Sequence, residues 1–126
     1  MQNTEIVLSN MGHTWIIDLD GTIVKHNGYK IDGIDSLLPG CKEFLENISH
    51  SDMIVFLTSR NVEYSEITEK FLKNEGIKWD FIIYGAPYGE RILINDDKPS
   101  GLQMSYSVNV SRDVGLNMNI VIDDKI

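Results

Sequence analysis

The sequence contains little cysteine, no long apolar run and few cationic side chains. Its single cysteine, Cys41, cannot form an intramolecular disulfide, and no second thiolate is present to build a metal site. The longest apolar runs, such as Met53–Leu57, are far shorter than the roughly 20 residues that cross a bilayer. The first residues also lack the basic and apolar regions of a signal peptide. We therefore expect a reduced, cytoplasmic protein without membrane contacts.

Cationic side chains are outnumbered by acidic ones. The 126 residues include 11 Lys and Arg against 19 Asp and Glu, and the net charge is −8. This balance argues against binding to nucleic acid or to an anionic membrane, because clustered Lys and Arg hold those partners. An anionic substrate would need a local countercharge. Apolar residues make up 42% and charged residues 24%, which is ordinary globular usage and predicts one folded domain over residues 1–126.

Short apolar segments rich in β-branched residues recur along the chain, and each is typical of a buried strand. Helical patterns separate the first three, and this alternation predicts a parallel sheet with helices on both faces. The expected fold class is therefore α/β, a doubly wound, Rossmann-like and mainly parallel sheet of about five strands. The expected strands are Trp15–Leu19, Met53–Leu57, Phe81–Tyr84, Ile92–Ile94 and, more weakly, Tyr106–Val110.

Two helices are expected between the first three strands. The first begins near Pro39 and places Phe44, Leu45 and Ile48 on one face. The second has Asn61 as its N-cap and Gly76 as its stop, and its apolar stripe consists of Ile67, Phe71 and Leu72.

Two further segments have weaker patterns. Residues 23–36 are polar and contain glycine, which suggests a hairpin or flap over the edge of the sheet. On this flap, His26 could recognise a sugar or phosphate, or the flap could be merely solvated. Residues 111–126 form a C-terminal extension whose last ten residues are either an extra edge strand or a poorly ordered tail.

Polar residues follow three of the expected strands. The first strand ends at Asp18 and Asp20, the second at Thr58, Ser59 and Arg60, and the fourth at Asp96, Asp97 and Lys98. Ligands of open α/β sheets bind beyond the carboxyl ends of the strands. Crowded carboxylates raise one another's pKa unless a cation lies between them, and oxygen ligands favour Mg²⁺. We expect Mg²⁺ as cofactor, bound by Asp18, Asp20 and Asp96, with Asp97 less certain.

Three of these segments resemble the signatures of the haloacid dehalogenase-like phosphatases. WIIDLDGTIV is similar to the first signature, IVFLTSR to the second and ILINDD to the fourth, in the right order over roughly residues 14–110. No room for a cap domain remains between the signatures, so the resemblance is to the small capless members. The chain is also similar to bacterial members associated with capsule or other surface polysaccharides. The resemblance implies a single hydrolase domain that removes phosphate from a small phosphorylated substrate, such as a sugar phosphate.

The resemblance also implies a role for each matching residue. Asp18 would be the nucleophile that forms an aspartyl phosphate, and Asp20 the general acid and base. Thr58 would hydrogen-bond the phosphoryl group, and Mg²⁺ would be held by Asp18, the carbonyl of Asp20 and Asp96. As an isolated residue, Thr58 could equally cap the following helix.

The third signature of that family, a Lys or Arg after the third strand, is not matched. This chain has Ala86 and Pro87 there. Arg91 would open the fourth strand and lie far from the site, so Lys98 is expected to contact the nucleophile. Ser59 and Arg60 are expected to bind substrate, although Arg60 could instead pair with Glu63 on a solvated face.

Three functions stay open on this evidence. The first is the magnesium-dependent phosphomonoester hydrolase. The second is a catalytically weak, phosphatase-like regulatory or interaction module, which the missing third signature favours. The third is a polynucleotide phosphatase, against which the net charge counts. A homo-oligomer is possible for an open, capless site.

Overall fold

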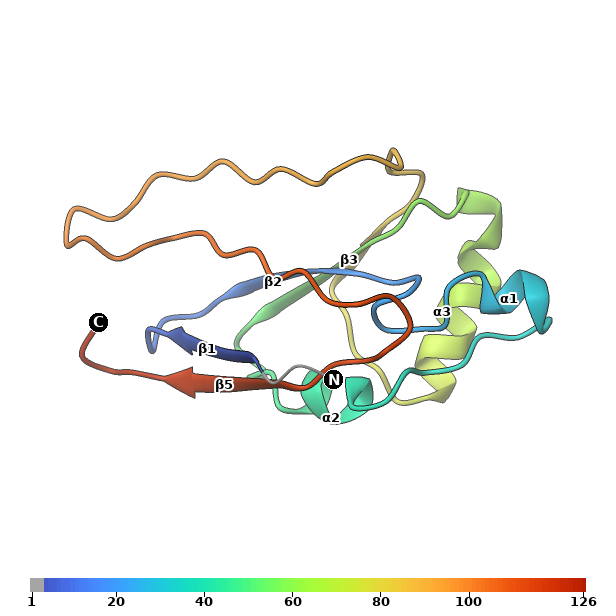
Figure 1. Ribbon diagram of the computed structural model, residues 1–126, viewed down its shortest axis with the longest axis horizontal. Helices are drawn as coiled ribbons and strands as arrows, with labels where there is room; N and C mark the ends of the chain where they lie inside the picture. The colour runs from blue at the N-terminus through green and yellow to red at the C-terminus, as the bar shows by residue number, and fades with distance from the viewer. Residues whose placement is uncertain (1–3) are drawn as a thin grey trace.

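The computed structural model describes residues 4–126 and shows a mixed α/β protein with parallel strands in two small sheets (Figure 1). The larger sheet has the order β2-β3-β4 and the smaller one pairs β1 with β5. All three pairings are parallel. The strands are β1 (Thr4–Leu8), β2 (Thr14–Asp18), β3 (Met53–Leu57), β4 (Phe81–Ile83) and β5 (Met118–Ile122).

The three-stranded sheet confirms the first three predicted strands to within one residue. Asp18 is paired with Leu57, and Leu57 with Ile83, so the three strands end side by side. Parallel neighbours need a crossover connection, and the helices between these strands supply it. The residues that follow β2 and β3 therefore lie at one edge of this sheet.

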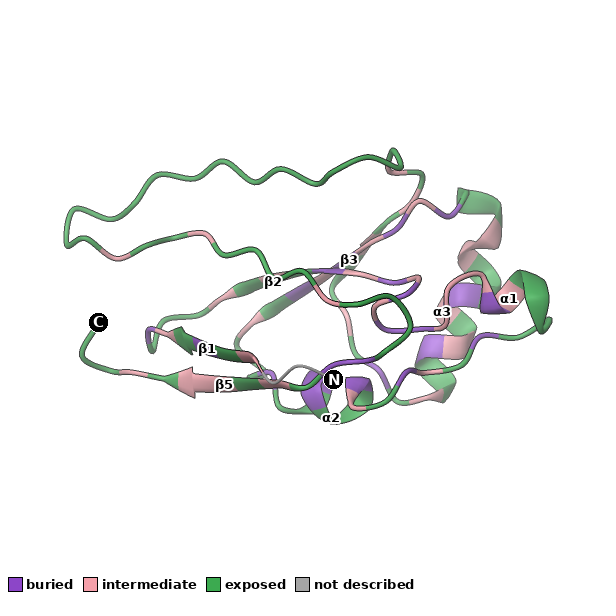
Figure 2. Ribbon diagram, in the orientation of Figure 1, coloured by how far each residue is buried: buried purple, intermediate pink, exposed green. Residues whose placement is uncertain are grey.

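The predicted strands Ile92–Ile94 and Tyr106–Val110 are wrong. Residues 91–110 form no strand and run as an extended, largely exposed segment outside both sheets (Figure 2). Ile92 is 82% exposed and Ile94 is 90% exposed. A strand needs a ladder partner and a face to bury, and neither is present along this segment. The C-terminal segment instead forms the strand β5, which pairs with β1, a strand that was not predicted. These two strands form a sheet of their own, so the expected single sheet of about five strands is divided into two.

The helix after Pro39 is α2 (Cys41–Glu46), and Phe44, Leu45 and Ile48 are buried as predicted. Cys41, the first residue of this helix, is fully buried, and burial raises the pKa of its thiol to about 11. The thiolate is therefore disfavoured at neutral pH, and the thiol is chemically quiet.

The second helix consists of η1 (Val62–Tyr64) and α3 (Ser65–Asn74). Asn61 Oδ1 accepts a hydrogen bond from the Glu63 amide at 3.2 Å, which confirms the predicted N-cap. Leu72 is buried as predicted, but Ile67 is 51% exposed and Thr68 faces the interior instead. The Thr68 hydroxyl accepts a buried hydrogen bond from Arg60, and this polar contact sets the face that α3 turns inward.

The expected flap, residues 23–36, is only partly a surface feature. Ile23 and Val24 belong to the buried core, and the short helix α1 (Gly28–Ile31) follows them. Within residues 4–126, no helix has the length and apolar character needed to span a bilayer.

Asp52 ties the start of β2 to the start of β3. Its Oδ1 accepts from the His13 amide at 3.0 Å, and its Oδ2 accepts from Trp15 Nε1 at 3.0 Å. Burial opposes ionisation of this carboxyl, but the hydrogen bonds outweigh it and lower the pKa of Asp52 below its usual value of 3.8.

We expect Asp52→Ala to lower the free energy of unfolding by about 1–3 kcal/mol at neutral pH, because it leaves buried donors unpaired. Since the pKa of Asp52 is lowered in the folded state, its contribution is present above the usual pKa and is lost as pH falls through the lowered one. Urea unfolding at neutral pH and at about pH 3 measures this. The exposed Asp124→Ala is the control, and equal losses in both variants would contradict the assignment.

Candidate functional site

The end of β2 and the turn after it present two carboxylates, Asp18 and Asp20, at the edge of the three-stranded sheet. Gly21 has φ of +85°, a left-handed conformation that glycine adopts without strain. The amides of Thr22, Ile23 and Val24 all donate to the Leu19 carbonyl and close the turn. Thr22 Oγ1 donates to Asp18 Oδ2 at 3.0 Å, so the sequence Asp18–Thr22 itself orients the Asp18 carboxylate.

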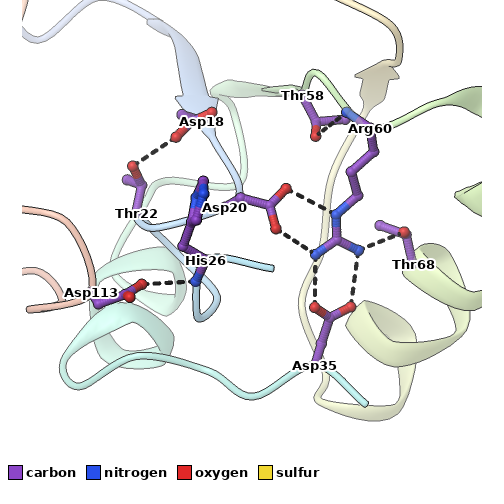
Figure 3. Close-up of polar contacts among 9 residues, drawn as sticks. All are labelled: Asp18, Asp20, Thr22, His26, Asp35, Thr58, Arg60, Thr68 and Asp113. Atoms are coloured by element: carbon purple, nitrogen blue, oxygen red, sulfur yellow. Dashed lines mark hydrogen bonds and ion pairs between the residues drawn. The ribbon is translucent and has the colours of Figure 1, made fainter. Parts of the chain in front are cut away.

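Arg60 is the centre of a buried ion network (Figure 3). Its Nε and Nη2 donate to the two oxygens of Asp20 at 3.0 and 2.9 Å. Nη2 and Nη1 also donate to the two oxygens of Asp35, at 2.7 and 2.9 Å. The remaining donor of Nη1 binds Thr68 Oγ1 at 2.8 Å. All five N–H groups of the guanidinium are therefore occupied.

This network corrects both expectations for Arg60. Its side chain is only 1% exposed, so it neither binds substrate phosphate nor pairs with Glu63 on a solvated face. Burial opposes its charge, but the bonds to Asp35 and Asp20 raise its pKa above the ordinary value. Asp35 and Thr68 were missed by the sequence analysis, because neither belongs to a motif.

An aromatic pair covers the network from the flap. The Tyr29 ring lies 4.0 Å from the Arg60 guanidinium carbon and packs edge-on against Tyr64 at 5.0 Å. Burial raises the pKa of the Tyr29 hydroxyl. The contact places α1 beside the pocket that contains Asp18 and Asp20.

Thr58 and Ser59 are placed differently from each other. Thr58 is buried, and its Oγ1 accepts a hydrogen bond from the Arg60 amide at 3.1 Å. This contact lies in the turn after β3 and does not cap the helix, because Asn61 is the N-cap of η1. Ser59 lines the open pocket at the site, and its Oγ accepts from Arg91 Nη2 at 3.4 Å. Ser59 is thus accessible to a ligand, whereas Thr58 lies beneath the pocket.

The cation beside Asp18 is Arg91. Its Nη1 donates to Asp18 Oδ1 at 3.1 Å, so the expectation that Arg91 lies far from the site is wrong. That expectation assumed a fourth strand, and without the strand the chain after Pro87 turns Arg91 back over the site. Lys98 lies in an exposed turn, and no ion pair joins it to Asp18 in the structure of residues 4–126.

The predicted magnesium ligands are not all brought together. Asp18 and Asp20 share the site, but Asp96 and Asp97 lie in the exposed segment and do not line the pocket. Asp18 is engaged by Thr22 and Arg91, and both oxygens of Asp20 are engaged by Arg60. Over residues 4–126 there is no group of three or more His, Cys, Asp or Glu side chains that could hold a metal. These residues, so arranged, do not fit a three-carboxylate magnesium site.

An open pocket of about 820 Å³ contains Asp18 and Asp20. It lies between the flap, the start of η1 and the chain after β4. The sequence has only three arginines, and all three line this pocket. The protein is strongly acidic overall, yet its guanidinium groups are gathered at one site. Arg60 is bound by Asp20 and Asp35, so Arg91 and Arg112 are the guanidinium groups that can supply the local countercharge for an anionic ligand.

Comparison with known proteins adds no relative. The chain matches no protein-family model, no curated protein and no solved structure.

We expect Asp35→Asn to lower the free energy of unfolding by about 3–5 kcal/mol, because it leaves the buried Arg60 charge only partly compensated. Asp32→Asn is the control, since Asp32 pairs with Lys25 at the surface and should contribute less than about 1 kcal/mol. Chemical denaturation of both variants measures the difference. Similar stabilities would show that the buried network contributes little.

Proposed function

We propose that this protein is a phosphomonoester hydrolase that acts through an aspartyl phosphate on Asp18. The observation that carries the proposal is an accessible carboxylate at a strand end, inside a pocket that all three arginines line. The substrate is a small phosphorylated molecule, and a sugar phosphate of surface polysaccharide synthesis fits the resemblance. The parallel β2-β3-β4 sheet supports a doubly wound, Rossmann-like relationship.

The first step follows from the contacts of Asp18. One of its oxygens attacks phosphorus, the bond to the ester oxygen breaks, and the phosphoryl group is transferred to the carboxylate. Thr22 Oγ1 restricts rotation of the carboxylate through its bond to Oδ2. Arg91 lies at Oδ1 and can move its donors to the phosphoryl oxygens, where charge develops in the transition state.

Asp20 is the proposed acid and base. It has to deliver a proton to the leaving oxygen and later accept one from the attacking water. Both of its oxygens accept hydrogen bonds from Arg60. An unprotonated carboxylate, the form that acts as a base, is bound in this way. Acting as an acid requires one of these bonds to open, and the second carboxylate, Asp35, can hold Arg60 in place meanwhile.

Phosphate release from p-nitrophenyl phosphate and from a panel of sugar phosphates tests the proposal. We expect Asp18→Asn to abolish turnover, because an amide oxygen is a far weaker nucleophile than a carboxylate. Asp124→Asn, which makes the same change at an exposed position outside the pocket, should retain wild-type turnover. Undiminished activity of the Asp18→Asn protein would contradict the assignment of Asp18 as the nucleophile.

The same assay with EDTA tests the cofactor. Because the residues of the site do not fit a three-carboxylate magnesium site, we expect turnover to persist in EDTA, with Arg91 as the charge compensation at phosphorus. Turnover that stops in EDTA and returns with added Mg²⁺ would contradict this and support the metal requirement that the resemblance implies.

The third-signature cation is tested by two single substitutions. We expect Arg91→Gln to lower kcat by about a hundredfold or more, since it removes a charged donor at the reacting carboxylate. Lys98→Gln should change kcat by less than about twofold, because Lys98 is exposed outside the pocket. The reverse pattern would restore Lys98 as the catalytic cation.

The regulatory module is the second candidate, and the full pairing of Asp20 with Arg60 favours it. Phosphate binding without turnover of any phosphate ester would support it. Hydrolysis of a phosphate-ended oligonucleotide in preference to small esters would favour the polynucleotide phosphatase instead.

A further inference from the structure

Arg112 reaches the site from the C-terminal extension. Its side chain lies across Gly21, in the turn between Asp20 and Thr22, and a Cβ atom at Gly21 would stand 3.1 Å from Arg112 Cγ. A larger residue at position 21 would displace this arginine. The close approach therefore places the guanidinium stem directly against the turn that carries the catalytic carboxylates.

The segment that carries Arg112 is anchored on both sides. The Asp113 amide donates to the Gly21 carbonyl at 2.9 Å, and Asp113 Oδ1 accepts from the His26 amide at 2.7 Å (Figure 3). The Leu116 amide donates to the Pro39 carbonyl at 2.9 Å. Gly115, with φ of +96°, lies against the Pro39 carbonyl, where a side chain would clash. Arg112 is thus held by a built turn over the site.

Arg112 differs from the other two arginines of the pocket in what its guanidinium contacts. Arg60 forms ion pairs with Asp20 and Asp35, and Arg91 forms one with Asp18. In the structure of residues 4–126, the Arg112 side chain makes neither a hydrogen bond nor an ion pair. It is an exposed residue that lines the pocket, so its donors are available to a ligand there.

His26 provides a second unmatched polar group at the same place. The Asp113 contact joins the backbone of His26 to the Arg112 turn, and the His26 ring points toward the Asp18–Thr22 turn (Figure 3). Its Nδ1 is buried and has no hydrogen-bond partner within residues 4–126. A buried polar atom without a partner is costly, and because His26 lines the pocket, a rotation of its ring would bring Nδ1 to a ligand group there.

We propose that Arg112 and His26 form a subsite for a second anionic group of the substrate, next to the phosphoryl site at Asp18. The inference rests on the proposed function and narrows its substrate class to phosphate esters that also carry a carboxylate or a further phosphate. A guanidinium suits both groups, because its donors match two oxygens at once. The segment 111–116 is therefore a specificity element that the resemblance does not assign.

Phosphonates test this subsite without turnover, because their carbon–phosphorus bond is not an ester. Calorimetry on the full chain compares propylphosphonate with 3-phosphonopropionate, which adds a carboxylate, and with propane-1,3-bisphosphonate, which adds a second phosphonate. We expect the chain to bind one or both doubly anionic probes about tenfold to a hundredfold more tightly than propylphosphonate. The stronger of the two identifies the second group.

Substitutions then test whether Arg112 causes the preference for doubly anionic phosphonates. Arg112→Gln should remove the tighter binding of the doubly anionic probes and leave the affinity for propylphosphonate within about twofold of the wild type. Arg112→Lys should keep part of that tighter binding, because it keeps the positive charge. Lys42→Gln makes the same charge change on the exposed side of α2 and should alter nothing. A preference that is absent from the wild type, or that survives in Arg112→Gln, overturns the subsite alone. Failure of propylphosphonate itself to bind overturns the subsite together with the phosphoryl site of the proposed function.

Discussion

The buried guanidinium of Arg60 is the interaction on which the site depends. A charge this deeply buried is unfavourable unless every donor is paired, and Asp20, Asp35 and Thr68 together pair all five. These three partners come from the turn after β2, from the end of the flap and from α3. One side chain therefore fixes the relative positions of three chain segments around the carboxyl edge of the sheet.

The same interaction explains how an acidic protein can offer a site to an anion. Arg60 neutralises carboxylates inside the protein, which leaves the outer arginines to face the pocket. Arg91 balances Asp18, and Arg112 lies over Gly21 without a protein partner in residues 4–126. The surface elsewhere stays acidic, so the pocket is locally more cationic than the rest of the molecule. Such a contrast favours binding of an anion at the pocket over the rest of the surface.

Local patterns predicted the elements whose stability is local or whose partners are near in sequence. Asn61 caps its helix, Pro39 precedes α2, and Met53–Leu57 is a strand with the predicted bounds. The pattern failed for Ile92–Ile94, because an apolar run forms a strand only where a neighbouring strand has a free edge in register. It also failed for Ile67, where the polar contact between Thr68 and Arg60 decided which side of α3 is buried.

By itself, the sequence determined the parallel α/β character of the β2–β4 region and the carboxylate pair Asp18 and Asp20 at a strand end. Both follow from residues close together in the chain, whose spacing is set by backbone geometry. Only the tertiary structure decided where the three arginines lie and which carboxylates they pair with. Arg60 turns inward, Arg91 reaches Asp18, and Arg112 comes to the site from the C-terminal extension. An ion pair is chosen by distance in space and by burial, and neither can be read from positions 73 residues apart, as Arg91 and Asp18 are.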